Sequence, residues 1–275
     1  MESDRLNSQM NAVKGVVLCG GEGARLRPLT YYFPKAMVPI GRSQKPLLEY
    51  IVRLMARHDV GEIILLVGYK SEQIMNYFGE GERFGVRLSY VHDKAGREGT
   101  GGALLNAYEE GAVTFDDELL VYYGDILSDI DLTAMREEHR SARASATLAL
   151  ARGYQVPVGT AKLDKDGRVI ELVEKPELDI AVTIAVMALE GEALRDLEAL
   201  VKAGKRKPDL MGDLIPALIR SGRLVHSYIH DSFWYDVAST ERYEKLDHET
   251  VEKLLETGTS PSRGSTSLSE RRIEQ

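Results

Sequence analysis

The first half of the chain alternates short apolar runs with segments whose apolar residues recur at helical spacing. Four runs rich in valine, isoleucine and leucine have the length of buried strands: 13–19, 61–68, 86–91 and 118–123. Three segments between them carry an apolar face: 46–58, 71–78 and 100–110. Strands that alternate with helices form βαβ units, so the pattern predicts a mainly parallel sheet covered on both faces. Ligands of such sheets bind at the carboxyl ends of the strands.

The second half is richer in strands. Four further strands are predicted: 145–151, 159–163, 169–173 and 182–189. Asp164-Lys165-Asp166-Gly167 favours a hairpin turn between the second and third of these. Residues 210–221 and 239–255 have helical spacing. The polar composition after Thr257 predicts one folded domain over 13–257 and a disordered tail over 258–275.

Composition and charge narrow the class of protein. The chain has 275 residues, 43% hydrophobic and 28% charged, which is typical of a soluble globular protein. A net charge of −8 argues against extended binding to nucleic acid. No apolar run reaches the roughly 20 residues needed to cross a bilayer, and the first residues do not resemble a signal peptide. With Cys19 as the only cysteine, we expect a cytoplasmic protein without disulfides.

The most informative segment is the glycine-rich turn after the first strand. Gly20, Gly21 and Gly23 would let the backbone approach a ligand closely and point N–H groups at phosphates. Arg25 and Lys35 follow and could neutralise a triphosphate. A dinucleotide fingerprint would need a third glycine where Leu26 stands, and the Gly-Lys-Ser/Thr of a P-loop is missing. The glycines alone are equally consistent with a plain strand–turn–helix junction.

Other short motifs have both a structural and a functional interpretation. Asp125 follows a central strand, where it could be a turn residue or a ligand of Mg²⁺, which prefers oxygen donors. Thr100 could cap the helix that it begins. Glu174-Lys175-Pro176 could be a surface turn, and the acidic run 116–118 is expected to be a solvated turn. The six histidines lack metal-ligand spacing, so we expect them to be surface or packing residues.

Taken together, these segments resemble the sugar-phosphate nucleotidylyltransferase family, which includes glucose-1-phosphate thymidylyl- and uridylyltransferases and mannose-1-phosphate guanylyltransferases. The resemblance is carried by matching stretches up to about Tyr243: 18–30, Pro34-Lys35, Pro46-Leu47-Leu48, Gly99 to Leu104, Gly124-Asp125, Glu174-Lys175-Pro176 and Trp234-Tyr235-Asp236. It implies a Rossmann-like three-layer α/β fold with a mixed, mainly parallel central sheet. It also implies transfer of a nucleotidyl group from a nucleoside triphosphate to a sugar 1-phosphate, with Mg²⁺ as the cofactor. Relatives are commonly oligomers, so a homo-oligomer is expected.

The resemblance also implies a role for each matching residue. Arg25 and Lys35 would be catalytic, and Asp125 and Asp236 would bind the metal. The remaining residues would bind the two substrates, the nucleotide through Gly20, Gly21, Gly23, Gly99 and Thr100, and the sugar phosphate through Gly159, Glu174, Lys175 and Thr183.

Some positions depart from the family pattern. Thr183-Ile184-Ala185 stands where Asn-Ala-Gly is expected, which would add bulk near the sugar, and Val237-Ala238-Ser239 replaces a glycine-containing turn. These departures leave open a regulatory subunit that binds sugar nucleotide without catalysis. A nicotinamide-dependent oxidoreductase is a third interpretation, disfavoured by the missing glycine. Relatives that transfer thymidylyl or uridylyl groups tend to carry a glutamine shortly before the Gly-Thr loop, and the segment 92–98 contains none. This favours guanine as the base of the nucleotide, or a different way of recognising a pyrimidine base.

Overall fold

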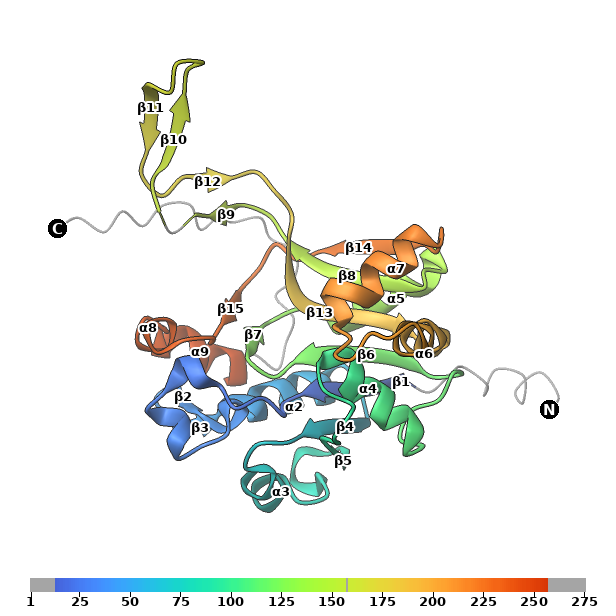
Figure 1. The fold of residues 1–275 in the computed structure, drawn as a ribbon. Coiled ribbons are helices and arrows are strands. Elements are labelled where there is room, and N and C mark those ends of the chain that lie inside the picture. The colour runs from blue at the N-terminus through green and yellow to red at the C-terminus, as the bar shows by residue number, and fades with distance from the viewer. Residues whose placement is uncertain (1–12, 157, 257–275) are drawn as a thin grey trace.

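A seven-stranded sheet forms the centre of the molecule in the computed structural model, which describes residues 13–156 and 158–256 (Figure 1). Its strand order is β14-β8-β13-β6-β1-β4-β5. Only β13 runs antiparallel to its neighbours; the other four strand pairs are parallel. The strands are β1 Val13–Leu18, β4 Glu62–Val67, β5 Arg87–His92, β6 Glu118–Tyr123, β8 Ala146–Ala151, β13 Val182–Glu190 and β14 Val225–Ile229. The predicted mixed, mainly parallel sheet is confirmed.

Helices cover both faces of this sheet, which gives three layers. One face packs against α2 Leu47–Arg57, α3 Ser71–Phe78, α5 Leu132–Ala142 and α9 His248–Glu256. The other packs against α4 Thr100–Glu109, α6 Leu194–Lys202 and α7 Ile215–Arg220. The central strands are buried on both faces, which explains why their sequences are continuous apolar runs rather than alternating ones. No helix among the described residues is long and apolar enough to span a membrane.

The strands predicted at 159–163 and 169–173 form a hairpin that does not join the central sheet. β10 Thr160–Leu163 pairs with β11 Val169–Val173, and Asp164 Oδ1 accepts hydrogen bonds from the turn N–H groups of Asp166 and Arg168. At its base, β9 Tyr154–Gln155 pairs with β12 Glu177–Leu178. We call these two strand pairs the arm; it projects away from the layers (Figure 1).

Two short strand pairs complete the carboxyl edge, β2 Pro39–Ile40 with β3 Lys45–Pro46 and β7 Ile126–Ser128 with β15 Trp234–Asp236. The single helix expected over 239–255 is instead two, α8 Thr240–Glu244 and α9. The carboxylate of Asp247 accepts hydrogen bonds from the N–H groups of Glu249 and Thr250, and this cap starts a new helix. The helix expected at 210–221 begins with a π-helical turn, Leu210–Leu214. The tail predicted over 258–275 lies outside the described residues.

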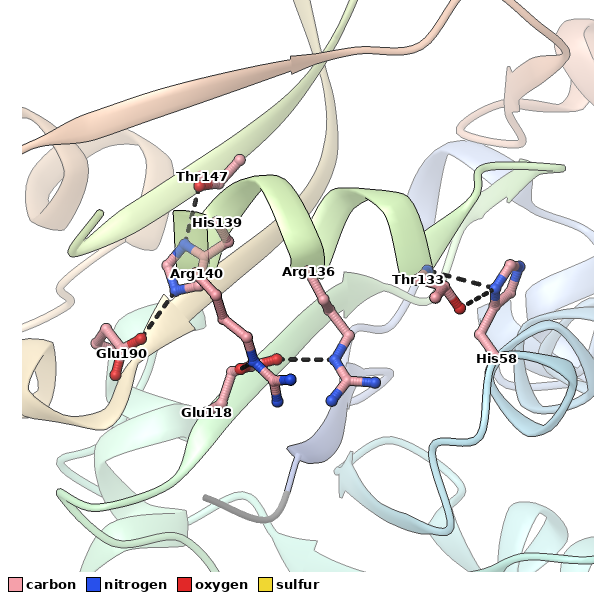
Figure 2. Close-up of polar contacts among 8 residues, drawn as sticks. All are labelled: His58, Glu118, Thr133, Arg136, His139, Arg140, Thr147 and Glu190. Atoms are coloured by element: carbon pink, nitrogen blue, oxygen red, sulfur yellow. Dashed lines mark hydrogen bonds and ion pairs between the residues drawn. The ribbon is translucent and has the colours of Figure 1, made fainter. Parts of the chain in front are cut away.

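The acidic run 116–118 is only partly the solvated turn expected from the sequence: Asp116 is exposed in a turn, but Asp117 and Glu118 are buried. Glu118 is buried, and its two carboxylate oxygens accept hydrogen bonds from Arg136 and Arg140 of α5 (Figure 2). Asp117 is also buried and pairs with Lys14 at 3.0 Å. The run lies at the start of β6, where the two arginines of α5 cover Glu118 and Lys14 covers Asp117.

The histidines behave as packing residues where they are buried. His139 is fully buried and hydrogen-bonds Thr147 and Glu190 (Figure 2). His230 is buried beside Ser128. Among the described residues, no three histidine, cysteine or acidic side chains gather as a metal site.

Candidate functional site

The glycine turn lies at the carboxyl end of β1 with its backbone N–H groups open. None of the N–H groups of residues 20–23 donates a hydrogen bond to a described residue. Gly23 has a φ of +64°, and a Cβ there would lie 2.9 Å from Cβ of Lys35. Glycine is therefore needed at this position both for the left-handed backbone and for space. Open N–H groups in such a turn form a concave surface suited to anions.

Thr30 keeps the turn in place from below. Its buried hydroxyl donates a hydrogen bond to the Gly23 carbonyl at 2.9 Å, while its own carbonyl accepts one from the Tyr69 hydroxyl at 3.0 Å. Leu26, in the short 3₁₀ turn Ala24–Leu26, is fully buried. The segment from the glycine turn to Thr30 thus combines buried residues that anchor it with Arg25, whose side chain is exposed to solvent.

The two predicted metal ligands lie side by side, although they are far apart in sequence. Asp125 lies one residue beyond β6, after Gly124, and Asp236 ends β15. Pairing of β15 with β7 sets Asp236 opposite Ile126, and the N–H of Val237 donates to the Asp125 carbonyl at 2.9 Å. Lys35 forms an ion pair with the Asp125 carboxylate. The structure therefore brings Lys35, Asp125 and Asp236 together beside the glycine turn.

The electrostatics of this group favour binding of a cation. Oδ1 of Asp236 is buried and has no hydrogen-bond partner among the described residues. Burial raises the pKa of Asp236 and the neighbouring Asp125 raises it further, while Lys35, Arg242 and Arg25 oppose the shift. Mg²⁺ is typically held by one or two carboxylates together with substrate phosphates. Two carboxylates with an unsatisfied oxygen, next to a phosphate-sized turn, fit this ion.

The residues after Asp236 form hydrogen bonds to the loop that carries Arg25. Ser239 caps α8, and the hydroxyl of Thr240 donates to the backbone carbonyls of Arg25 at 3.3 Å and Arg27 at 3.2 Å. Nε of Arg242 donates to the Asp236 carbonyl at 2.6 Å. Although Val237-Ala238-Ser239 differs from the family pattern, Asp236 and the loop of Arg25 are therefore still joined by hydrogen bonds. Thr240 and Arg242 were not predicted as site residues, because a single hydroxyl or guanidinium group bonded to backbone leaves no pattern in the sequence.

Gly99 and Thr100 are held by a neighbouring loop. Gly99, not Thr100, is the residue that precedes α4, so the interpretation of Thr100 as the cap is wrong. The Thr100 hydroxyl instead donates to Asp209 and accepts from the N–H of Leu210, both at 2.8 Å. A Cβ on Gly99 would lie 2.6 Å from the Pro208 carbonyl. The Thr100 hydroxyl is therefore occupied by hydrogen bonds to the neighbouring loop.

The predicted sugar-phosphate residues Gly159, Glu174 and Lys175 belong to the arm. A Cβ on Gly159 would lie 2.9 Å from Oε2 of Glu174, so these two residues are neighbours. Lys175 adopts a left-handed φ of 45° and is exposed. Among the described residues, no hydrogen bond or ion pair joins this group to Asp125 or Asp236. The structure therefore gathers the predicted site residues into two groups, one on the sheet and one on the arm.

The segment Thr183-Ile184-Ala185 forms an irregularity in β13. Pairing with β8 shifts register between Thr183 and Met187, and Ala185 has a left-handed φ of 57°. The Thr183 hydroxyl accepts a hydrogen bond from the N–H of Ala185 at 3.2 Å. Ile184 is buried in the core, so its expected bulk near the sugar is directed inward instead. Ala185 holds a conformation that favours glycine, at a cost of roughly 1–2 kcal/mol.

A mainly parallel sheet with an open glycine turn, two carboxylates and a lysine at its carboxyl edge has the architecture of α/β proteins that bind their ligands at this edge. The chain belongs to the nucleotidyl transferase family, whose family model matches residues 14–253.

Relatives of the chain include several enzymes that act on sugar phosphates. It is 31% identical over 243 residues to a UTP–glucose-1-phosphate uridylyltransferase from Synechocystis, covering 84% of this chain and 61% of the relative. It is 32% identical over 233 residues to a mannose-1-phosphate guanylyltransferase from Mycobacterium tuberculosis, covering 84% and 62%. The chain thus spans about three fifths of the length of these relatives. A D-glycero-alpha-D-manno-heptose 1-phosphate guanylyltransferase from Aneurinibacillus thermoaerophilus is 28% identical and is covered over 98% of its length.

Solved structures share the fold. The crystal structure of HddC from Yersinia pseudotuberculosis superposes with a TM-score of 0.63 at 22% identity, covering 86% of this chain and 99% of that one. A structure from Bacillus anthracis, described as a glucose-1-phosphate thymidylyltransferase in complex with a sucrose, gives a TM-score of 0.67 at 20% identity, with 92% and 98% covered. The Rossmann-like α/β fold expected from the sequence is confirmed.

Proposed function

We propose that the chain is a sugar-1-phosphate nucleotidylyltransferase, which converts a nucleoside triphosphate and a sugar 1-phosphate into a nucleoside diphosphate sugar and pyrophosphate. The observation that carries the proposal is the group of Lys35, Asp125 and Asp236 beside the open N–H groups of the glycine turn. The names of the relatives support the same reaction class.

The reaction needs no covalent nucleophile from the protein. A phosphate oxygen of the sugar phosphate attacks the α-phosphorus, and the bond from that phosphorus to the bridging oxygen of the β-phosphate breaks, so pyrophosphate leaves with the electron pair. Catalysis is then positioning and charge neutralisation. Gly20, Gly21 and Gly23 hold phosphates by their N–H groups, and Arg25 and Lys35 neutralise the triphosphate and the leaving pyrophosphate. Asp125 and Asp236 would hold Mg²⁺, which when bound withdraws electron density from the α-phosphate.

For the residues that would bind the rest of the two substrates, we propose the roles expected from the sequence. Gly99 and Thr100 face the nucleotide through the backbone of their loop, since the Thr100 hydroxyl is already bonded to Asp209. Glu174 and Lys175 bind the sugar phosphate together with Gly159 and Thr183. The absence of any polar partner for Glu174 and Lys175 among the described residues leaves both side chains available for a ligand.

A pyrophosphate-release assay with Mg²⁺ tests the reaction. GTP, UTP, dTTP, CTP and ATP are crossed against the 1-phosphates of glucose, mannose, galactose and N-acetylglucosamine. Release that requires both one triphosphate and one sugar phosphate would support the enzyme and identify its substrates. Release from a triphosphate alone would indicate hydrolysis and contradict the proposal.

The regulatory subunit is the second candidate. It is favoured by the separation of the arm residues from Asp125 and Asp236, and by Ala185 where the family pattern has glycine. Folded protein that binds a nucleoside diphosphate sugar by calorimetry but releases no pyrophosphate in the whole screen would favour it.

We also propose that the chain forms homo-oligomers through the arm. A two-stranded hairpin is at best marginally stable alone in water. On β11, the side chains of Val169, Ile170 and Leu172 are exposed by 61%, 59% and 71%. Such a concentration of exposed apolar side chains is typical of a surface that is covered in an assembly.

A further inference from the structure

His230 connects the central sheet to the pair of strands β7 and β15. It directly follows β14, and its backbone N–H donates to the Leu150 carbonyl of β8 at 2.8 Å. The residue is only 5% exposed. Nε2 of its ring lies 3.0 Å from the carbonyl oxygen of Phe233, 3.2 Å from Oγ of Ser128 and 3.3 Å from Oδ1 of Asp129. One buried nitrogen thus contacts the end of β7 and the residue that leads into β15.

The chemistry of these neighbours requires a hydrogen on Nε2. A carbonyl oxygen and an ionised carboxylate can only accept hydrogen bonds, so the ring nitrogen beside them has to be the donor. The Asp129 carboxylate is held on its other oxygen by Ser232, whose hydroxyl donates to Oδ2 at 2.6 Å. Burial raises the pKa of Asp129, but hydrogen bonds from His230 and Ser232 outweigh it and lower the pKa. Removal of the ring would leave the buried Oδ1 atom of Asp129 without this partner, which is costly in a protein interior.

The β7–β15 pair is short and depends on the contacts at its ends. Each strand is three residues long, and among the described residues β15 pairs with no strand except β7 (Figure 1). A pair of strands this small is at best marginally stable alone. At one end, the Phe233 carbonyl accepts hydrogen bonds from the N–H of Asp129 at 3.2 Å and from His230. At the other end, Asp236 lies opposite Ile126. His230 is therefore one of the contacts that hold the strand of Asp236 against β7.

The two carboxylates at the far end of this pair oppose each other until a cation binds. Burial raises the pKa of Asp236, and the negative charge of Asp125 raises it further. Two like charges stay side by side only if the backbone that carries them is fixed. In metal sites generally, removal of a group that orients a ligand lowers metal affinity or activity by about 10- to 100-fold.

Resting on the proposed function, we infer that His230 is a positioning residue, which holds β15 against β7 so that Asp236 stays beside Asp125 and the two carboxylates bind Mg²⁺ more tightly. The ring acts as a hydrogen-bond donor in this role. A side chain that donates from the same place should therefore replace it, whereas a side chain that only fills the space should not.

The test is the gain in nucleotide affinity that Mg²⁺ provides. Calorimetry gives the dissociation constants of GTP and UTP in Mg²⁺ and in EDTA for wild type, His230→Leu and His230→Gln. Leucine keeps most of the packing volume but has no donor, whereas glutamine places an amide N–H near the position of Nε2. His230→Leu should reduce the gain by up to about 10-fold, the low end for loss of a group that orients a metal ligand, and should leave the affinity in EDTA unchanged. His230→Gln should retain most of the gain.

Trp234, the only tryptophan of the chain, gives a second readout because it lies in β15. Acrylamide should quench its fluorescence more strongly in free His230→Leu than in wild type or His230→Gln, since the strand is held less firmly. His226→Ala removes a more exposed histidine of β14 and is the matched control; it should behave as wild type in both readouts. If His230→Leu does not fold, His230→Asn takes its place with the same expected loss, because its amide is too short to reach the Phe233 carbonyl.

An equal gain from Mg²⁺ in wild type and His230→Leu would overturn the inference. So would a loss of the same size in Mg²⁺ and in EDTA, which would indicate a purely structural role, and so would a His230→Gln protein that behaves like His230→Leu. Failure of wild type to bind either nucleotide, or binding that Mg²⁺ does not strengthen, would instead contradict the proposed function itself, so the two failures are distinguishable.

Discussion

At the residue scale, the chemistry of the site depends on a few charges held against backbone. Lys35 is central, because it packs on Gly23 and pairs with Asp125. It thereby connects the phosphate-binding turn to the carboxylate pair. Arg25 is placed differently, since only its backbone is fixed, through Thr240, while its side chain stays exposed. Lys35 is therefore held in place in the free protein, whereas in the proposed function Arg25 would gain its contacts from the substrate.

Lys35→Ala should lower kcat by about 10²–10³-fold, the usual loss for one preorganised charge contact in a transition state. Steady-state pyrophosphate release with the substrates found in the screen measures this effect. Lys202→Ala, which removes an exposed lysine of α6, is the control and should behave as wild type. Full activity in a folded Lys35→Ala protein would contradict the catalytic role of this side chain.

Glu49 is a second residue whose charge matters, in this case for stability. This buried carboxylate of α2 accepts hydrogen bonds from Tyr77 of α3 at 2.6 Å and from Arg53 at 2.8 Å. Burial alone would raise the pKa of Glu49, but the hydrogen bonds from Tyr77 and Arg53 outweigh it and lower the pKa below the ordinary value of 4.5. Its ionised form therefore stabilises the fold above this value, and that contribution is lost as the pH falls through the lowered pKa.

Glu49→Gln should therefore be less stable than wild type at neutral pH, and the difference should shrink below about pH 4. Urea unfolding at a series of pH values measures the free energy of unfolding. Glu72→Gln, on the exposed side of α3, should show no such convergence. A difference between wild type and Glu49→Gln that is constant over the whole series would show that the carboxylate charge is not responsible.

At the element scale, the apolar runs predicted six of the seven strands of the central sheet, all except β14. Val13–Leu18 and Glu62–Val67 are buried on both faces, so their side chains had to be apolar throughout. Helix α5 was missed because its sequence is mostly polar; its polar residues pair with Glu118 and Glu190 of the sheet or face solvent. β14 was missed because its half-buried edge position leaves polar residues such as His226 and Ser227 in the strand.

The candidate site was predictable only where residues are close in sequence. The glycine turn, Lys35 and each aspartate came from local motifs and their family resemblance. The proximity of Asp125 to Asp236 depends on pairing of β7 with β15, and the Thr100 hydroxyl bonds Asp209, which lies 109 residues further along the chain. These contacts are set by the sheet order, which local patterns do not encode. The inward direction of Ile184 likewise follows from the irregularity in β13.

The arm gives the prediction at this scale. Leu172→Asp places a charge among its exposed apolar side chains but removes no contact from the core, since Leu172 is 71% exposed. If the arm carries the assembly, this change should shift the protein to a smaller mass by light scattering after size exclusion. Its thermal unfolding midpoint as a monomer should remain close to that of wild-type monomer. Lys165→Ala, in the exposed turn of the same hairpin, should leave the mass unchanged. A wild-type oligomer that Leu172→Asp leaves intact would contradict an arm-mediated assembly.

At the scale of the whole molecule, the carboxyl and amino edges of the sheet differ in how their charged side chains are paired. The carboxyl edge carries the open turn and the carboxylate pair, where Oδ1 of Asp236 has no hydrogen-bond partner among the described residues. The amino edge carries charges that are satisfied within the protein, above all Glu118 between Arg136 and Arg140 (Figure 2). Strand β6 joins both, since it begins at Glu118 and leads into Asp125. The proposed ligand site and the buried ion pairs of Glu118 therefore lie at opposite ends of one central strand.

This division predicts that Glu118→Ala changes stability without changing the chemistry. Removal of the carboxylate leaves two arginines without their buried acceptor, which should lower the free energy of unfolding by about 3 kcal/mol; this is at the low end for a broken buried ion pair because Arg140 can reach solvent. Urea unfolding measures this loss, and Glu137→Ala on the exposed face of α5 is the control. At a temperature where both variants are folded, kcat and the affinity for nucleotide should equal those of wild type. Loss of activity in folded Glu118→Ala would show instead that β6 transmits changes from the amino edge to Asp125, and the two edges would have to be treated as one coupled unit.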